Sequence, residues 1–136
     1  MEFDTKFVVV LDESLAVWQK LNVTAFLTSG VVGEDPTMIG EPYEDASAQT
    51  YSSLCIQPVI VLKSARARLN TMLGRAQSRG VKTAVYIEDM FATGHDAANR
   101  ETVAGYATDA LPLVGIALRG DKKTVDKITK GAKLHD

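Results

Sequence analysis

The stretch Lys6-Phe7-Val8-Val9-Val10-Leu11 is apolar on both faces and predicts a strand buried within a sheet. Three further apolar runs follow it, at residues 57–62, 82–87 and 111–118. The segments between these runs show the three- and four-residue spacing of apolar side chains that is typical of amphipathic helices. Strands that alternate with such helices predict an α/β fold, with a central sheet and helices on both faces. Because single helices connect the strands, we expect mostly parallel neighbours with right-handed crossovers.

Each predicted helix has an expected inner face. The first should follow a cap at Asp12 or Ser14 and bury Leu15, Trp18, Leu21 or Asn22, Ala25 and Phe26. The second should follow a cap at Ser64 and bury Leu69, Met72, Leu73 and Ala76. A short helix is expected over residues 97–106, and a last one after Asp121 with Val125 and Ile128 inward. Within the fourth apolar run, Gly115 indicates that another segment approaches the backbone closely.

Length and composition fit a single domain over residues 1–136. No apolar run approaches the roughly 18 residues of a membrane span, so we expect no membrane association. Cys55 is the only cysteine and cannot form an internal disulfide. A lone cysteine suits a reducing compartment, which predicts a cytoplasmic protein.

Charge is distributed unevenly along the chain. Residues 1–62 carry 2 basic and 9 acidic side chains, whereas residues 63–136 carry 13 basic and 8 acidic ones. The basic groups could form a surface for phosphates or an acidic partner, or they could be solvated helix faces. The chain's pI of about 5.7 is far below that of typical nucleic-acid-binding domains, so we expect no nucleic-acid partner.

Residues 33–55 form the least regular part of the sequence. Gly33, Pro36, Gly40 and Pro42 interrupt any helix or long strand there. The segment Met38 to Asp45 could hold a short strand or one arm of a hairpin. Long loops in compact domains often serve function, so this segment is a candidate interaction region.

The strongest candidate site follows the third apolar run, in Tyr86-Ile87-Glu88-Asp89-Met90-Phe91-Ala92-Thr93-Gly94-His95-Asp96-Ala97-Ala98-Asn99-Arg100. Ligands bind beyond the carboxyl ends of strands in open α/β sheets, and polar side chains crowd this position. Asp89 could orient a water or act as a base, with Thr93 as its hydrogen-bond partner. His95, Asp96 and Asn99 could bind a ligand. The alternative is that these residues cap the next helix and hold the loop in place.

The sequence lacks the motifs of several cofactor-dependent classes. The dinucleotide-binding glycine pattern and the P-loop motif are both missing. Two histidines and one cysteine make a closed zinc site improbable. We therefore predict neither a metal nor a cofactor.

Three segments resemble a mainly bacterial family catalogued as domain of unknown function two thousand. They are residues 38–46, residues 57–62 and Thr93-Gly94-His95-Asp96-Ala97-Ala98-Asn99-Arg100. That family resembles type II peptidyl-tRNA hydrolases. The resemblance covers nearly the whole chain and implies a three-layer α/β/α fold with a mixed four-stranded central sheet. At least one strand should then be antiparallel, and the resembled fold is often dimeric. Because Phe26, Phe91 and Tyr106 do not all fit inside so small a domain, we also predict a homodimer.

The hydrolase motifs carry over unevenly to this chain. In the resembled pattern, Lys20 keeps a first lysine, while Asn22 replaces a second lysine, Phe26 a glutamine and Ser29 a histidine. After the third apolar run, Asp89 and Thr93 match the hydrolase pattern, but its arginine is missing. Asn22 cannot stabilise an oxyanion by charge, and Phe26 cannot hydrogen-bond a substrate. The fold can be shared while the function is not.

Three functional hypotheses follow. The first is a protein of unassigned function with a small-ligand or weakly hydrolytic site. Its catalytic candidates are Asp89, Thr93 and Lys20, and its ligand-binding candidates are Asn22, His95, Asp96 and Asn99. The second is retained peptidyl-tRNA hydrolase activity. The third is a non-enzymatic binding module that uses residues 33–55 and the helix carrying Arg66 and Arg79.

Overall fold

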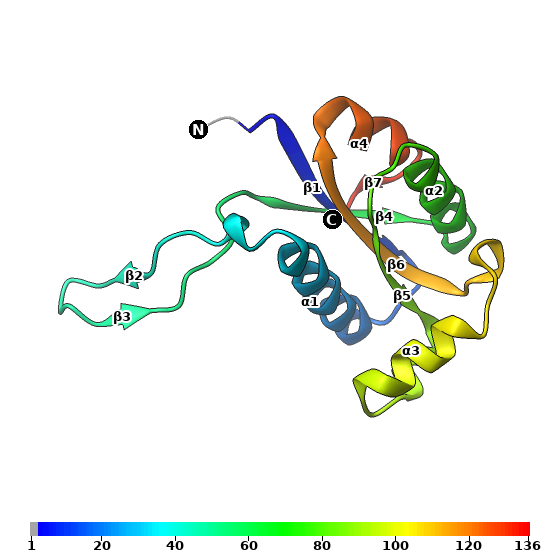
Figure 1. Ribbon diagram of the computed structural model, residues 1–136, viewed down its shortest axis with the longest axis horizontal. Helices are drawn as coiled ribbons and strands as arrows, with labels where there is room; N and C mark the ends of the chain where they lie inside the picture. Colours follow the sequence, from blue (N-terminus) through cyan, green and yellow to red (C-terminus); the bar gives the residue numbers. More distant parts are fainter. Residues whose placement is uncertain (1–2) are drawn as a thin grey trace.

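The computed structural model describes residues 3–136, so Met1 and Glu2 of the predicted domain lie outside the described residues. Three layers are visible in Figure 1, with a central sheet between α1 on one face and α2 and α4 on the other. The main elements in chain order are β1 (Thr5–Asp12), α1 (Val17–Glu34), β2 (Tyr43–Glu44), β3 (Thr50–Tyr51), β4 (Val59–Ser64), α2 (Arg66–Ser78), β5 (Ala84–Ile87), α3 (Asp96–Ala104), β6 (Leu113–Asp121), α4 (Lys122–Ile128) and β7 (Lys133–Leu134). Short 3-10 helices lie at Pro36–Met38 (η1), Glu88–Ala92 (η2) and Thr108–Ala110 (η3).

The central sheet has the strand order β5-β6-β1-β4-β7. Strands β1 and β4 are parallel, whereas β6 is antiparallel to both of its neighbours and β7 is antiparallel to β4. The predicted α/β class and mixed sheet are therefore confirmed. The expectation of mostly parallel neighbours is wrong, because β6 inserts between β1 and β5 in the opposite direction.

The prediction of four strands is also wrong, since the central sheet has five. The fifth, β7, pairs Lys133 and Leu134 with Lys63 and Leu62 of β4. The backbone N–H of His135 extends this contact by donating to the Val61 carbonyl oxygen at 3.0 Å. A strand of two residues is too short to produce an apolar run, so the sequence pattern does not reveal it.

Strand β1 supplies side chains to both hydrophobic cores. Val8 and Val10 point toward α2 and α4, where the predicted inner residues of both helices are buried. Phe7, Val9 and Leu11 point to the opposite face, beneath α1. This alternation follows from the two-residue period of a strand and explains why the whole run is apolar.

Helix α1 packs on the sheet with a different face from the one expected. Its buried residues are Val23, Leu27 and Val31, whereas Trp18 and Phe26 are 61% and 54% exposed. The pattern was ambiguous because apolar side chains occur on more than one side of this helix. Gly115 of β6 decides between the faces, since a Cβ there would lie 2.7 Å from Val23 Cγ1 and 3.0 Å from Leu27 Cδ1. The predicted close approach at Gly115 is thus confirmed.

Residues 39–56 form a hairpin arm that projects away from the three layers (Figure 1). Its strands β2 and β3 pair only with each other. Asp45 shapes the turn by accepting the N–H groups of Ser47 at 2.8 Å and Gln49 at 3.0 Å. The predicted hairpin arm is present, although it lies outside the compact part of the fold.

None of the helices within residues 3–136 has the length and apolar character needed to span a membrane.

We predict that Gly115→Ala lowers the free energy of unfolding by about 1–3 kcal/mol, because the added methyl pushes Val23 and Leu27 away from the sheet. Gly74→Ala is the matched control. It lies in α2 with open space around it, and should raise stability by about 0.5–1 kcal/mol through helix propensity. Urea unfolding of both variants measures these changes. Equal effects of the two substitutions would contradict the close packing of α1 on β6.

Candidate functional site

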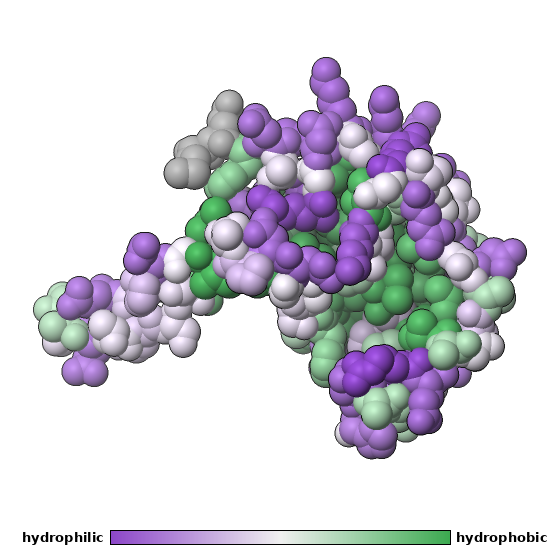
Figure 2. Space-filling view, viewed as in Figure 1, coloured by the Kyte–Doolittle hydropathy of each residue, from purple (hydrophilic) through white to green (hydrophobic). Residues whose placement is uncertain are grey.

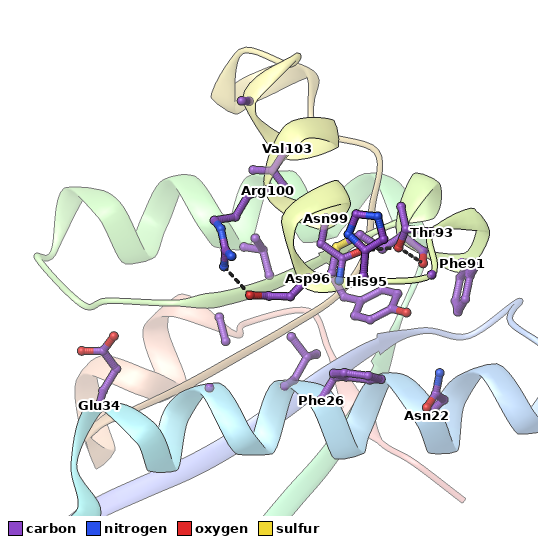
Figure 3. Close-up of a pocket in the computed structure, with 18 of the residues that line it drawn as sticks. Asn22, Phe26, Glu34, Phe91, Thr93, His95, Asp96, Asn99, Arg100 and Val103 are labelled. Atoms are coloured by element: carbon purple, nitrogen blue, oxygen red, sulfur yellow. Dashed lines mark hydrogen bonds and ion pairs between the residues drawn. The ribbon is translucent and has the colours of Figure 1, made fainter.

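A cleft of about 1080 Å³ lies between α1 and α3, along the edge strand β5 (Figure 3). Helix α1 forms one wall, and η2 with the start of α3 forms the other. Hydrophobic side chains gather in the hollow over β5 and β6 beside α3 (Figure 2). The volume is at the upper end of the range for small-molecule sites, which makes this cleft the leading candidate in the described chain.

Four aromatic rings line the cleft in an unbroken series. The ring centroids of Trp18 and Phe91 are 5.9 Å apart, those of Phe91 and Tyr86 5.2 Å, and those of Tyr86 and Phe26 6.0 Å. Trp18 and Phe26 reach this wall because they lie eight residues apart on α1, on the side of the helix next to β5 and η2. Tyr86 is buried on β5, and its burial raises the pKa of its hydroxyl. Rings at these distances pack favourably and leave aromatic surface open to the cleft.

Polar side chains face this aromatic wall from the loop before α3. The Thr93 hydroxyl lies 3.0 Å from the Met90 carbonyl oxygen and also contacts the Asn99 side-chain oxygen. His95 is the N-cap of α3, where its Nδ1 accepts the Ala98 N–H at 3.2 Å. The neutral His95 ring therefore carries its proton on Nε2 and offers a hydrogen-bond donor.

The charged groups at the rim of the cleft are paired. Arg100 contacts Asp96 at 2.6 Å, one helical turn apart on α3. At the other end, Lys82 contacts Glu34 at 3.0 Å. Both acidic side chains of the rim are thus compensated, and the cleft has no evident preference for a charged ligand.

The structure brings together some of the predicted site residues and leaves others outside. Asn22, Thr93, His95, Asp96 and Asn99 all line the cleft. Two of the three predicted catalytic residues, Asp89 and Lys20, do not.

Asp89 and Lys20 are kept apart from the cleft for different reasons. Asp89 lies on η2 and accepts the Tyr106 hydroxyl at 2.8 Å, a hydrogen bond that raises the pKa of Tyr106. Lys20 is two residues from both Trp18 and Asn22, which places it on the other side of α1. Within residues 3–136 no ion pair joins Lys20 to Asp89, so the expected cleft between these two is not formed.

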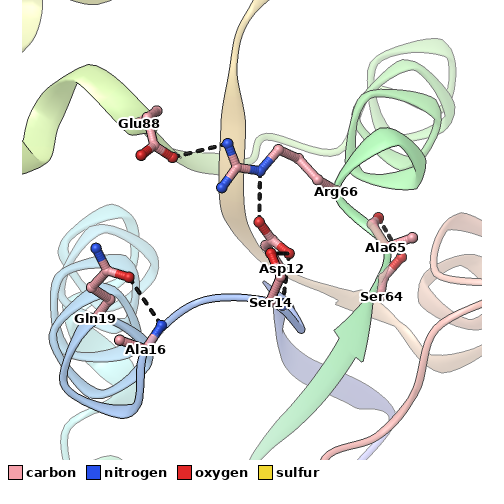
Figure 4. Close-up of polar contacts among 8 residues, drawn as sticks. All are labelled: Asp12, Ser14, Ala16, Gln19, Ser64, Ala65, Arg66 and Glu88. Atoms are coloured by element: carbon pink, nitrogen blue, oxygen red, sulfur yellow. Dashed lines mark hydrogen bonds and ion pairs between the residues drawn. The ribbon is translucent and has the colours of Figure 1, made fainter.

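A second polar cluster was not predicted as a site. It lies at the end of the sheet where the carboxyl ends of β1, β4 and β5 meet (Figure 4). The Arg66 guanidinium bridges two carboxylates, with Nε 2.6 Å from Asp12 and Nη1 2.9 Å from Glu88. Asp12 is buried and also accepts the N–H and hydroxyl of Ser14, at 2.9 and 2.8 Å. A charged residue at the end of each of these three strands, or within two residues of it, was the available signal.

The environment of Asp12 keeps its carboxylate ionised. Burial by itself would raise the pKa of Asp12, but the Ser14 N–H, the Arg66 guanidinium and the Ser14 hydroxyl outweigh it and lower the pKa. Because Arg66 is matched by two acids, the cluster has no cation left over to bind an anion. We therefore interpret the cluster as a structural link between the carboxyl ends of these strands, not as a ligand-binding site.

No three His, Cys, Asp or Glu side chains of the described residues converge in a way that could hold a metal ion.

The comparisons with known proteins agree with this fold. Residues 5–136 match the family described as Protein of unknown function (DUF2000), so the chain belongs to that family. A solved structure of a protein of unknown function from Agrobacterium tumefaciens strain C58 is 52% identical, with a TM-score of 0.97. The similarity covers 99% of this chain and 100% of that one. No curated protein matches the chain.

We predict that Asp12→Ala lowers the free energy of unfolding by about 3 kcal/mol at pH 7, because it removes the partner of Arg66 and the acceptor for Ser14. The folded-state pKa of Asp12 is lowered, so its stabilisation is fully present above its unfolded pKa of about 3.9 and is lost as pH falls through the folded value. The difference between wild type and variant should therefore shrink below pH 4.

Urea unfolding between pH 3 and pH 7 measures this difference. Asp109→Ala, at an exposed aspartate on η3, is the control and should change stability little. A loss of stability at Asp12→Ala that is constant over this pH range would contradict the role of the ionised carboxylate.

Proposed function

We propose that this member of the DUF2000 family binds a small, uncharged ligand with a planar aromatic group in the cleft between α1 and α3. The observation that carries the proposal is the pairing of a continuous aromatic wall with a polar loop in one cleft. Small-molecule sites typically combine apolar and aromatic walls with a few convergent polar groups.

The two walls would contact different parts of such a ligand. Trp18 and Phe26 offer exposed ring surface, against which a planar group can stack or pack edge to face. The Asn22 amide, on the same wall as these rings, and His95 Nε2, across the cleft, have no hydrogen-bond partner among the described residues. These groups would hydrogen-bond a hydroxyl, carbonyl or amide on the ligand. The compensated charges at the rim favour a ligand without net charge.

The same geometry argues against hydrolysis in this cleft. A neutral His95 with its proton on Nε2 is a donor toward the cleft, while its Nδ1 is occupied by α3. The Thr93 hydroxyl is engaged by Met90 and Asn99, and Asp89 is engaged by Tyr106 outside the cleft. No positioned pair of nucleophile and base remains, as general base catalysis requires. Binding without turnover is therefore the function that the geometry supports best.

Peptidyl-tRNA hydrolysis stays a hypothesis that rests on the sequence resemblance alone. Neither the family description nor the structural neighbour names such an activity. Asn22 and Phe26, which replace a lysine and a glutamine of the resembled motif, both line the cleft. An aromatic ring at position 26 suits stacking on a ligand better than contact with a polar ester.

We predict that benzamide, a neutral planar probe with one amide, binds in the cleft, whereas the non-planar cyclohexanecarboxamide binds more weakly. Trp18 is the only tryptophan, so its fluorescence reports on the cleft directly. Phe26→Ala should weaken benzamide binding about three- to tenfold by removing one aromatic contact. Titrations followed by tryptophan fluorescence and by thermal shift measure both effects.

Leu134→Ala is the control for this experiment, because Leu134 is an exposed apolar residue on β7, at the opposite edge of the sheet. It should leave benzamide binding unchanged. Equal affinity for the planar and non-planar probes, or equal loss in both variants, would overturn the proposal.

We further predict that purified protein cleaves peptidyl-tRNA at least about a hundredfold more slowly than a type II peptidyl-tRNA hydrolase. The expected cause is the loss of the charge and the amide at Asn22 and Phe26. Release of tRNA from a peptidyl-tRNA substrate measures the rate, with Asp89→Ala measured beside it. Robust turnover that Asp89→Ala abolishes would mean that this protein is a hydrolase.

A further inference from the structure

The hairpin arm is an ordered segment that its own chain does not cover. All side chains of residues 41–52 are exposed, and β2 and β3 contact each other but no other element of the sheet. An isolated two-stranded hairpin is at best marginally stable in water, because it has no core. An arm of this kind is expected to pack against another molecule.

The pairing of the arm gathers apolar side chains on one of its faces. The register that pairs Tyr43 with Tyr51 also pairs Ile39 with Cys55. Because side chains alternate along a strand, these four side chains lie on the same face. Ile39, Tyr43 and Tyr51 are between 41% and 56% exposed. Leu54 and Ile56 add further exposed apolar surface at the root of the arm, where Figure 2 shows hydrophobic residues.

Helix α1 carries a second uncovered apolar surface, its outer face. This outer face is formed by Val17, Trp18, Leu21 and Ala25. Val17 and Leu21 are 72% and 68% exposed, which is unusual for two large aliphatic residues one helical turn apart. Lys20 is the only charged residue of α1 before Glu34. A low density of charge distinguishes the centres of protein interfaces from ordinary surface.

We propose that the arm of one copy packs on the outer face of α1 of a second copy, and that the second copy returns the same contact. The arm points away from the layers of its own chain and cannot cover its own α1 (Figure 1). A reciprocal exchange about a two-fold axis covers both unpartnered surfaces at once. Closed two-fold dimers of this kind are the commonest homo-oligomers.

Charge selects this arrangement over direct pairing of two arms. The arm contains Glu41, Glu44 and Asp45 and no basic residue. Two arms side by side would place six acidic groups together, which is unfavourable. The outer face of the partner's α1 carries no acidic side chain, so the arm meets no like charge there.

The dimensions of the two surfaces are also compatible. Seven residues of strand separate Ile39 from Ala46 at the tip, a reach of roughly 23 Å. The outer face from Val17 to Ala25 is roughly 12 Å long.

The exposed area supplies a large part of what a stable dimer buries. Trp18, Tyr43 and Tyr51 are each more than half exposed, and an aromatic side chain can bury 150–250 Å². These three rings supply roughly 300 Å² per copy, against the ~800 Å² that each partner buries in a standard interface. The aliphatic side chains of Val17, Leu21, Ala25 and Ile39 add to this area.

This interface is independent of the ligand proposed above. The arm, Val17 and Leu21 do not line the cleft, and of the outer face only Trp18 also borders it. Failure of benzamide to bind would leave the dimer intact, and a monomeric protein could still bind benzamide.

The test begins with sedimentation equilibrium of the full chain. Wild type should be a dimer, and Tyr43→Ser/Tyr51→Ser should weaken dimerisation at least about a hundredfold, since tyrosines are frequent interface hot spots. Leu21→Glu should have a similar effect by placing an acid opposite the acidic arm. Gln77→Glu is the matched control, at an exposed position on α2 behind the sheet, and should remain dimeric. Circular dichroism of each variant verifies that it is folded.

Mixing the two defective variants distinguishes the proposed exchange from other dimers. The Leu21→Glu copy retains an intact arm, and the Tyr43→Ser/Tyr51→Ser copy retains an intact α1. One of the two contacts can therefore form only between unlike copies, so the mixture should yield a 1:1 heterodimer. A monomeric wild type would overturn the proposal, as would a dimer insensitive to both changes. Folded variants that fail to complement each other would exclude the contact between arm and α1.

Discussion

The buried carboxylate of Asp12 joins the strands and helices that meet at the carboxyl end of β1. It ends β1, accepts two hydrogen bonds from Ser14 before α1, and contacts Arg66 in the first turn of α2. Through Arg66 it is linked to Glu88, which follows β5. A buried charge is costly unless it is paired and hydrogen-bonded, so these partners are required once Asp12 is buried. The direction in which α1 leaves the sheet, and with it one wall of the cleft, depends on this arrangement.

Helix α1 serves two environments, which explains its unusual sequence. Its inner residues Val23 and Leu27 pack closely on β6 because Gly115 provides the space. Its other sides remain apolar although the chain does not bury them. Trp18 and Phe26 turn toward the cleft, and Val17 and Leu21 face solvent. Exposing these apolar side chains to water is unfavourable. A ligand in the cleft would cover Trp18 and Phe26, and a second copy of the chain would cover Val17 and Leu21.

The side chains that line the cleft also contact one another. Phe26 belongs to the aromatic series that lines the cleft. The polar loop across the cleft uses part of its hydrogen-bonding capacity for its own structure, as the His95 cap shows. The residues that hold this loop in place therefore also line the cleft.

Several features of the fold follow from local patterns in the sequence. These are the buried strands, the inner faces of α2 and α4, the close approach at Gly115 and the polar loop from Thr93 to Asn99. A period of two or of 3.6 residues, or a single glycine, is enough to encode each of them. Four other features became visible only in the folded chain: the direction of β6, the pairing of β7, the packed face of α1 and the separation of Lys20 from Asp89. These features depend on which distant segments meet, and residue spacing along one chain carries no direct record of that.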